Sequence, residues 1–209
     1  MENKKLIINI GRQWRSGGRD IAQKLANILD CQFYDKEIIN LAARESGLDE
    51  GVFERHDESK SFMHTIIGGM AAPFVTDSSF FNNNFSQENL FRIQSEAIRK
   101  AASNESCIFV GRCADYVLRD FDNVLNIFIT ANREDRIKRI AVIEGCTDEA
   151  KAMKMIEQHD EERSEYYGYY TGKIWGHCES YDLCVNSSIL GIDATTDYIV
   201  EFIKRRFKL

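Results

Sequence analysis

The sequence predicts an α/β protein whose core is a parallel sheet of five strands with helices on both faces. Short apolar segments rich in β-branched residues alternate with longer segments whose apolar residues recur at helical spacing. The short segments lack the polar alternation of strands that face water, which indicates strands buried on both faces. With 209 residues, of which 44% are hydrophobic, the chain can form one well-buried domain but not two ordinary ones.

The first predicted strand covers residues 6–10 and leads through a glycine-bearing turn into a helix. Ile21, Leu25 and Ile28 recur at helical spacing after that turn. The main-chain N–H groups at the start of a helix have no partner within the helix, and the helix dipole is positive there. The turn is therefore a candidate site for an anion such as a phosphate group.

The candidate cofactor-binding residues are those of this turn: Gly11, Arg12, Arg15, Ser16, Gly17, Gly18, Arg19 and Asp20. Its glycines permit positive φ and a close approach of the backbone, and its arginines add positive charge. The turn departs from the P-loop pattern G-x-x-x-x-G-K-[ST], because five residues separate Gly11 from Gly17. Gly18 and Arg19 stand where the pattern has its lysine and its Mg²⁺-binding hydroxyl residue.

The remaining elements follow in alternation. Further strands are predicted at residues 31–34, 107–110, 124–129 and 181–185, and helices at 86–102, 132–144, 147–167 and 195–206. Asn132 is the expected N-cap of its helix and Gly145 the expected stop. Ligands of such sheets bind beyond the carboxyl ends of the strands, so the glycine turn, Asp35 and Gly111-Arg112 should meet at one edge.

Composition restricts the cellular context and the partners. No apolar run approaches the roughly 20 residues that span a bilayer, and the charged N-terminus leads directly into a strand, so we expect a cytoplasmic protein without membrane contact. The net charge of −6 argues against a nucleic-acid polymer as the main partner. The cysteines are dispersed, and Cys31, Cys107 and Cys184 fall in predicted strands, so we expect small buried side chains in a reducing compartment.

The segment 59–87 differs from the rest of the chain in its composition and in its lack of periodicity. It holds a glycine pair, the only proline, a run of asparagines and five phenylalanines, without sustained periodicity. So many aromatic residues argue against permanent disorder. We interpret the segment as a cover that folds over a ligand or against a second subunit of a homodimer, and a loosely packed insertion is the alternative.

The pair Gly111-Arg112, followed by the strand at 124–129 and an arginine-rich helix, resembles cytidylate kinase, in which a G-R-D segment precedes such a strand. Residues 33–35 and 182–186 are similar to further motifs of that family. The first turn is closer to a cytidylate-kinase-like group of bacterial proteins with S-R-x-x-G-S-G-G-R, matched here by Arg12 and by residues 16–19. The resemblance covers nearly the whole chain, except residues 53–84.

This resemblance implies a three-layer P-loop kinase fold over residues 1–209, with an acceptor-binding or cover insertion at 36–85 and a lid at 157–177. It also implies phosphoryl transfer from ATP, with Mg²⁺, to a nucleoside monophosphate such as CMP or to a similar small acceptor. The implied substrate-binding residues are Asp35, Arg44, Arg112 and Asp115. Arg112 corresponds to the arginine that holds the acceptor phosphate. Cys113 replaces the aspartate of G-R-D, and Asp115 is its candidate substitute.

The lid of such kinases carries arginines that close on the phosphates. In this chain Arg163 and Lys173 are the candidates for closing charges, and Arg19 is the candidate to replace the missing lysine. The catalytic candidates are thus Arg19, Arg112, Arg163 and Lys173. Ser16 or Asp20 is the candidate ligand of Mg²⁺.

Two other functions remain open. The chain could bind a nucleotide or phosphate without turning it over, because the P-loop lysine and hydroxyl residue are missing. Residues 38–55 also resemble a helix-turn-helix, which would indicate DNA binding. Its second helix would be acidic over residues 49–54, and a phosphate backbone requires the opposite charge.

Overall fold

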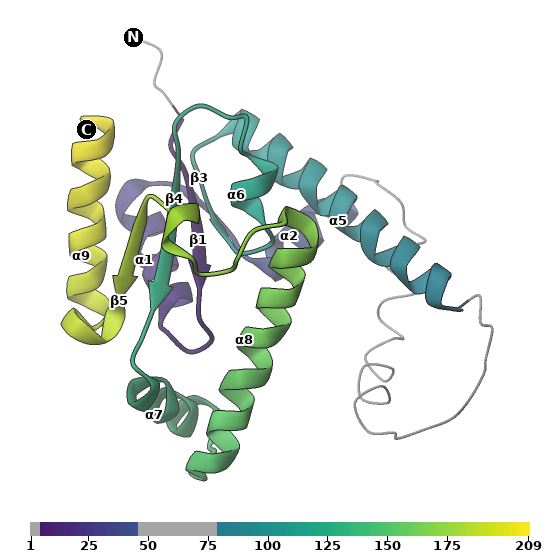
Figure 1. Cartoon of the computed structure of the whole chain (residues 1–209). Coiled ribbons are helices and arrows are strands. Elements are labelled where there is room, and N and C mark those ends of the chain that lie inside the picture. Colours follow the sequence, from purple (N-terminus) through teal and green to yellow (C-terminus); the bar gives the residue numbers. More distant parts are fainter. Residues whose placement is uncertain (1–4, 46–78) are drawn as a thin grey trace. The chain divides into compact units, whose positions relative to one another are not determined.

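The computed structural model describes the main chain of residues 5–45 and 79–209, and the side chains of these residues except 42–45 and 79–86 (Figure 1). The chain divides into two compact units. The first comprises Met1–Lys36 and Ala101–Leu209, and the second comprises Glu37–Lys100. We describe each unit by itself.

The first unit is built on a five-stranded sheet of order β2-β3-β1-β4-β5. Its strands are β1 (Ile7–Arg12), β2 (Gln32–Tyr34), β3 (Cys107–Val110), β4 (Val124–Thr130) and β5 (Leu183–Asn186). Every pairing is parallel, which confirms the predicted α/β fold class. β1 extends beyond the predicted end at Ile10, because Gly11 and Arg12 continue the pairing with β4.

The helices of this unit begin and end where turns and glycines permit. They are α1 (Gly18–Leu29), α6 (Ala114–Val117), α7 (Arg133–Glu144), α8 (Glu149–Thr171) and α9 (Ser187–Phe207), with a short 3₁₀ turn, η2, at Cys178–Ser180. Gly145 ends α7 in the left-handed conformation, as predicted. The predicted start of the last helix is wrong, since α9 follows β5 directly and contains a break at Gly191, where φ is 77°.

Two apolar layers enclose the sheet. Ile8 and Ile10 of β1 pack with Ile21 and Leu25 of α1 and with Ile199 of α9, and all five side chains are buried. Rings cover the other face, where Phe128 of β4 contacts Trp175 and Tyr181. Strands buried on both faces explain why the sequence shows continuous apolar runs.

The cysteines follow this burial only in part. All six are free thiols, and Cys31 and Cys107 are buried as predicted. The prediction for Cys184 is wrong, because this side chain is exposed. It lies on β5, which is an edge strand of the sheet, whereas β3 has neighbours on both sides. No helix among the described residues has the length and apolar character needed to span a membrane.

The described part of the second unit consists of helical segments. These belong to α2 (Lys36–Glu45) and α5 (Ser79–Asn104), which each continue into the first unit. The Gln94 side chain donates a hydrogen bond to Asn40 Oδ1 at 2.6 Å and so joins α5 to α2. The end of the predicted cover is thus helical, while residues 59–78 and the second helix of the helix-turn-helix interpretation lie outside the described residues.

Candidate functional site: an anion-binding loop before α1

A tight loop joins β1 to α1 at residues 13–17. Gly17 is the N-cap of α1 and has φ of 80°, a conformation that side chains rarely adopt. A Cβ atom on Gly17 would lie 3.1 Å from the Ile192 side chain, and one on Gly18 would lie 2.6 Å from Cβ of Arg12. Both glycines are therefore required by the geometry of the loop.

The main-chain N–H groups of this loop divide into bonded and unbonded donors. Ser16 N–H donates to the Gln13 carbonyl at 3.2 Å, and Gly18 N–H donates to Ser16 Oγ at 3.3 Å. Within the part of the chain that the structure describes, the N–H group of Arg15 has no acceptor, and neither do three N–H groups at the start of α1, those of Gly17, Arg19 and Asp20. These three donors lie at the positive end of the α1 dipole, which is a suitable place for an anion.

The carbonyl groups of the loop are held by donors from other elements. The carbonyls of Trp14, Arg15 and Ser16 accept from Arg136 at 2.6 Å, from Arg139 at 3.1 Å and from the Ser187 hydroxyl at 2.5 Å. Successive carbonyls engaged in this way leave the N–H groups as the unsatisfied polar groups of the loop. Helices α7 and α9 thus fix a loop conformation that favours negative charge.

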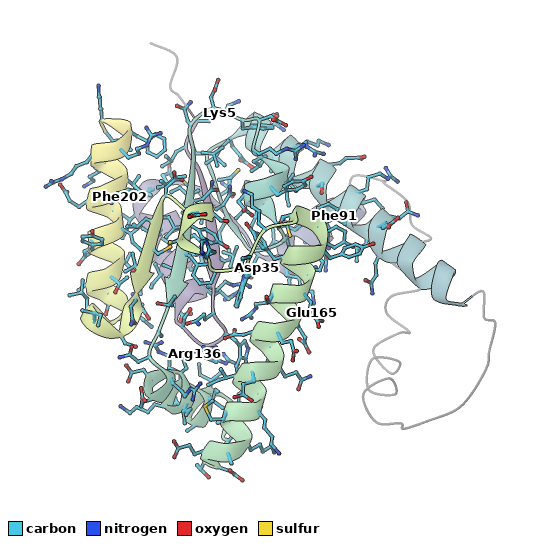
Figure 2. All side chains as sticks on the ribbon, in the orientation of Figure 1. Lys5, Asp35, Phe91, Arg136, Glu165 and Phe202 are labelled. Carbon is cyan, nitrogen blue, oxygen red and sulfur yellow. The ribbon has the colours of Figure 1, made fainter. Side chains whose placement is uncertain are left out.

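The ion pair between Arg136 of α7 and Asp160 of α8 holds both main-chain polar groups of Trp14 in the loop. Trp14 N–H donates to Asp160 Oδ1 at 2.7 Å, while the guanidinium of Arg136 binds both the Trp14 carbonyl and Asp160 Oδ2. The Arg136 side chain is only 6% exposed and lies between α7 and α8 (Figure 2). Sequence analysis did not identify Arg136 or Asp160 as part of the site. The only features of the sequence that pointed to them were the arginine-rich helix and the position of an aspartate on the same helix face as Arg163.

Two further guanidinium groups lie beside the loop with unsatisfied donors. Arg15 Nε and Arg163 Nη1 are buried and have no hydrogen-bond partner among the described residues. Arg163 Nη1 lies 3.6 Å from Asp160 Oδ1, which is an ion-pair distance but too long for a hydrogen bond. Burial lowers the pKa of both arginines, and Arg15 further lowers that of Arg163. Neighbouring cations with spare donors indicate an anionic ligand.

Arg19 forms an ion pair at the end of β2. Its guanidinium donates twice to Asp35 Oδ2, from Nη2 at 2.6 Å and from Nε at 3.1 Å, and it lies over the Phe33 ring. The Asp35 side chain is 4% exposed, whereas that of Arg19 is 61% exposed. The sequence-predicted residues Arg19 and Asp35 are thus brought together, but as partners of each other.

The turn after β3 holds the predicted acceptor residues in unusual backbone conformations. Arg112 and Cys113 both have positive φ, of 57° and 53°. The Arg112 guanidinium lies over the Tyr166 ring at 5.2 Å, and the buried Asp115 accepts a hydrogen bond from Tyr167 at 2.7 Å. Burial raises the pKa of Tyr166. Tyr166 and Tyr167 of α8 thus contact Arg112 of the turn and Asp115 of the following helix α6.

Arg12 connects this turn to the loop. A Cβ atom on Gly111 would collide with the Arg12 guanidinium, so that group lies against the carboxyl end of β3. The sheet therefore brings Arg12 and Gly111 together at one edge, as predicted. Lys173 is exposed just beyond the end of α8, and the side chain of Arg44 lies outside the described residues.

The oxygen ligands that Mg²⁺ requires are largely committed elsewhere. The Ser16 hydroxyl is fully buried and accepts from Gly18 N–H, so it does not fit the predicted role of metal ligand. Asp35 is bound by Arg19, and Asp20 is exposed in the first turn of α1. Among the described residues, no group of three or more His, Cys, Asp or Glu side chains could hold a metal ion. Of the two predicted metal ligands, the Ser16 hydroxyl is thus engaged and Asp20 remains exposed.

A parallel sheet of order 2-3-1-4-5, with a glycine-bearing loop between its central strand and the following helix, is the arrangement of P-loop kinase folds. The sequence model of the cytidylate kinase-like family matches residues 7–189. The chain belongs to the cytidylate kinase-like family. No curated protein matches it.

Two solved structures are similar in fold to this chain. A crystal structure of an uncharacterized protein from Eubacterium ventriosum is 30% identical, covers 97% of this chain and 99% of that chain, and has a TM-score of 0.73. A shikimate kinase from Bacteroides thetaiotaomicron is 13% identical, covers 98% of this chain and 99% of that chain, and has a TM-score of 0.52. At that identity the second likeness shows the fold alone.

Proposed function

We propose that the chain binds the phosphates of ATP at the start of α1 and transfers the terminal phosphoryl group to a nucleoside monophosphate, such as CMP, or to a similar small acceptor. The observation that carries this proposal is the loop whose carbonyls are held by α7 and α9 while three N–H groups lack acceptors. Family membership supports the same reaction class.

In the proposed transfer, an acceptor oxygen forms a bond to the terminal phosphorus while the bond to the bridging oxygen of ADP breaks. A nucleoside monophosphate attacks through an ionised phosphate oxygen, an alcohol acceptor releases its proton to water, and negative charge spreads over the transferred group. The unsatisfied donors of Arg15 and Arg163 supply hydrogen bonds to that charge. Arg112 binds the acceptor phosphate at the end of β3. Mg²⁺ that arrives with ATP neutralises part of the phosphate charge.

A second candidate function is nucleotide binding without turnover. Gly18 and Arg19 replace the lysine and the hydroxyl residue of the P-loop pattern, and this loss removes two groups that act on the phosphates in P-loop enzymes. The same loop would then bind a nucleotide and release it unchanged.

An ADP-release assay separates these functions. Purified protein is incubated with Mg-ATP and a panel of nucleoside monophosphates and small alcohols, and ATP binding is measured in parallel by calorimetry. We expect ADP formation that depends on one class of acceptor. ATP binding without ADP formation from any acceptor would favour the second candidate, and the absence of ATP binding would refute both.

A further inference from the structure

A guanidinium group stands where the P-loop pattern has a metal-binding hydroxyl. In G-x-x-x-x-G-K-[ST], the last residue binds Mg²⁺, and Arg19 occupies that position here. Arg19 belongs to the first turn of α1, which also carries N–H groups without acceptors, and its guanidinium is bound to Asp35. A fixed positive charge is therefore present at the place where the pattern uses a divalent cation.

The position of this charge is set by a buried carboxylate. Asp35 at the end of β2 is nearly fully buried, and a buried carboxylate without a cation is strongly unfavourable. Two hydrogen bonds from Nε and Nη2 of Arg19 to one carboxylate oxygen orient the guanidinium plane. Arg19 Nη1 has no acceptor among the described residues, so one edge of the group remains available to a ligand oxygen.

The geometry also engages two of the three candidate metal ligands, Asp35 and Ser16, while Asp20 stays exposed in the first turn of α1. A carboxylate that accepts two hydrogen bonds from arginine has lost much of its attraction for a cation. The Ser16 hydroxyl is buried and engaged by Gly18. A metal that used Asp35 would therefore have to displace Arg19 from it.

We propose that the Arg19–Asp35 ion pair takes the place of the protein-bound Mg²⁺, so that this loop binds a nucleoside triphosphate in its metal-free form as well as its Mg²⁺ complex. The inference rests on the proposed nucleotide binding and concerns the cation requirement of the same site. The main-chain donors of α1 and the free edge of Arg19 together neutralise the phosphates.

Titration of the protein with ATP, in excess EDTA and in excess Mg²⁺, tests this proposal by calorimetry. The wild-type dissociation constants in the two conditions should agree within about threefold. Arg19→Ser restores the hydroxyl of the pattern and releases Asp35. Its affinity in EDTA should fall at least about tenfold, and Mg²⁺ should restore most of the loss.

Two further variants control this result. Arg19→Ser removes the ion-pair partner of a buried carboxylate, so Arg19→Ser combined with Asp35→Asn is measured beside it, with folding checked by thermal unfolding. The double variant should lose affinity in EDTA and regain little with Mg²⁺, because the carboxylate is gone. Arg205→Ala is the matched control, since Arg205 is an exposed arginine paired with Glu201 on α9, and it should change neither affinity.

The outcomes distinguish the two proposals. Wild-type binding that requires Mg²⁺, or an Arg19→Ser protein as indifferent to Mg²⁺ as the wild type, overturns the role of the ion pair and leaves the proposed nucleotide binding intact. Absence of ATP binding in both conditions overturns both proposals. Metal-independent wild-type binding that becomes Mg²⁺-dependent in Arg19→Ser supports the ion pair as the resident cation.

Discussion

One arginine beside the loop, Arg163 of α8, lies where its charge contributes little to stability. Arg163 is largely buried, carries an unsatisfied Nη1, and is repelled by the charges of Arg136 and Arg15. Burial is the main cause of its lowered pKa, and attraction by Asp160 and Glu162 opposes the repulsion. A side chain with such surroundings contributes little to folding, which is the expected property of a group that awaits an anion.

The first prediction concerns this residue. Arg163→Met removes a repelled charge and keeps an apolar stem, so the unfolding free energy should stay within about 1 kcal/mol of the wild type or rise. ADP formation should fall at least about tenfold, because one charge-assisted donor to the transferred group is lost. Lys154→Met, an exposed change on the same helix, is the control. A large loss of stability with unchanged turnover would identify Arg163 as a structural residue.

The second prediction concerns the aspartate that binds the loop. Asp160→Asn leaves the buried Arg136 without its counterion and weakens the acceptor of Trp14 N–H, so we expect a loss of about 2–4 kcal/mol in unfolding free energy. Urea denaturation measures this loss, and ATP affinity should fall with it. Glu165→Gln, at an exposed position of α8, should change neither quantity. Equal effects of the two substitutions would contradict a role for Asp160 in holding the loop.

At the scale of elements, the turn between β3 and α6 combines three successive residues with positive φ, Gly111, Arg112 and Cys113. Gly111 meets a second constraint, because its missing side chain leaves room for the Arg12 guanidinium. The backbone of the turn thus positions Arg112, and the space at Gly111 accommodates the guanidinium of Arg12.

The third prediction separates these two constraints. Gly111→Ala and Gly145→Ala both place a side chain at positive φ, and each should lower the unfolding free energy by about 1–2 kcal/mol. A Cβ at Gly145 meets nothing within 4 Å, whereas one at Gly111 displaces Arg12. Only Gly111→Ala should therefore weaken ATP binding, measured by calorimetry. Equal affinities of the two variants would show that Arg12 does not contact the nucleotide.

The sequence was informative where one element determines its own structure. We could identify the apolar runs of β1, β3 and β4 and the glycine turn, because adjacent residues determine both burial and conformational freedom. The start of α9 could not be identified, because the glycine at the break, Gly191, is a residue typical of loops. The contacts of Trp14 with Arg136 and Asp160, and of Arg19 with Asp35, join distant segments and depend on the packing of whole helices.

At the scale of the whole molecule, buried acids make stability sensitive to alkaline pH. Burial raises the pKa of the Cys31 thiol to about 11, those of Cys107 and Cys113 to about 12, and that of Tyr181 to about 12. The ordinary value for a thiol is 9.0. Between these values the unfolded chain loses protons that the folded chain retains.

The fourth prediction follows from that difference. The unfolded state binds fewer protons above about pH 9, so the unfolding free energy should be nearly constant from pH 7 to 8.5 and fall progressively toward pH 10.5. Denaturation at each pH measures this dependence. Cys107→Ala should reduce the alkaline slope, and a slope that this change leaves unaltered would exclude Cys107 as a source.

The division of the chain into two units has a consequence for how such proteins diversify. The second unit is one uninterrupted insert between β2 and β3, while the loop, its arginines and Asp35 all belong to the first unit. A single exchange of residues 37–100 by recombination would replace the predicted acceptor-binding segment, including Arg44, and leave every contact described around the loop unaltered. With one junction on each side of this segment, the predicted acceptor-binding segment could therefore change while the proposed phosphate-binding loop is preserved.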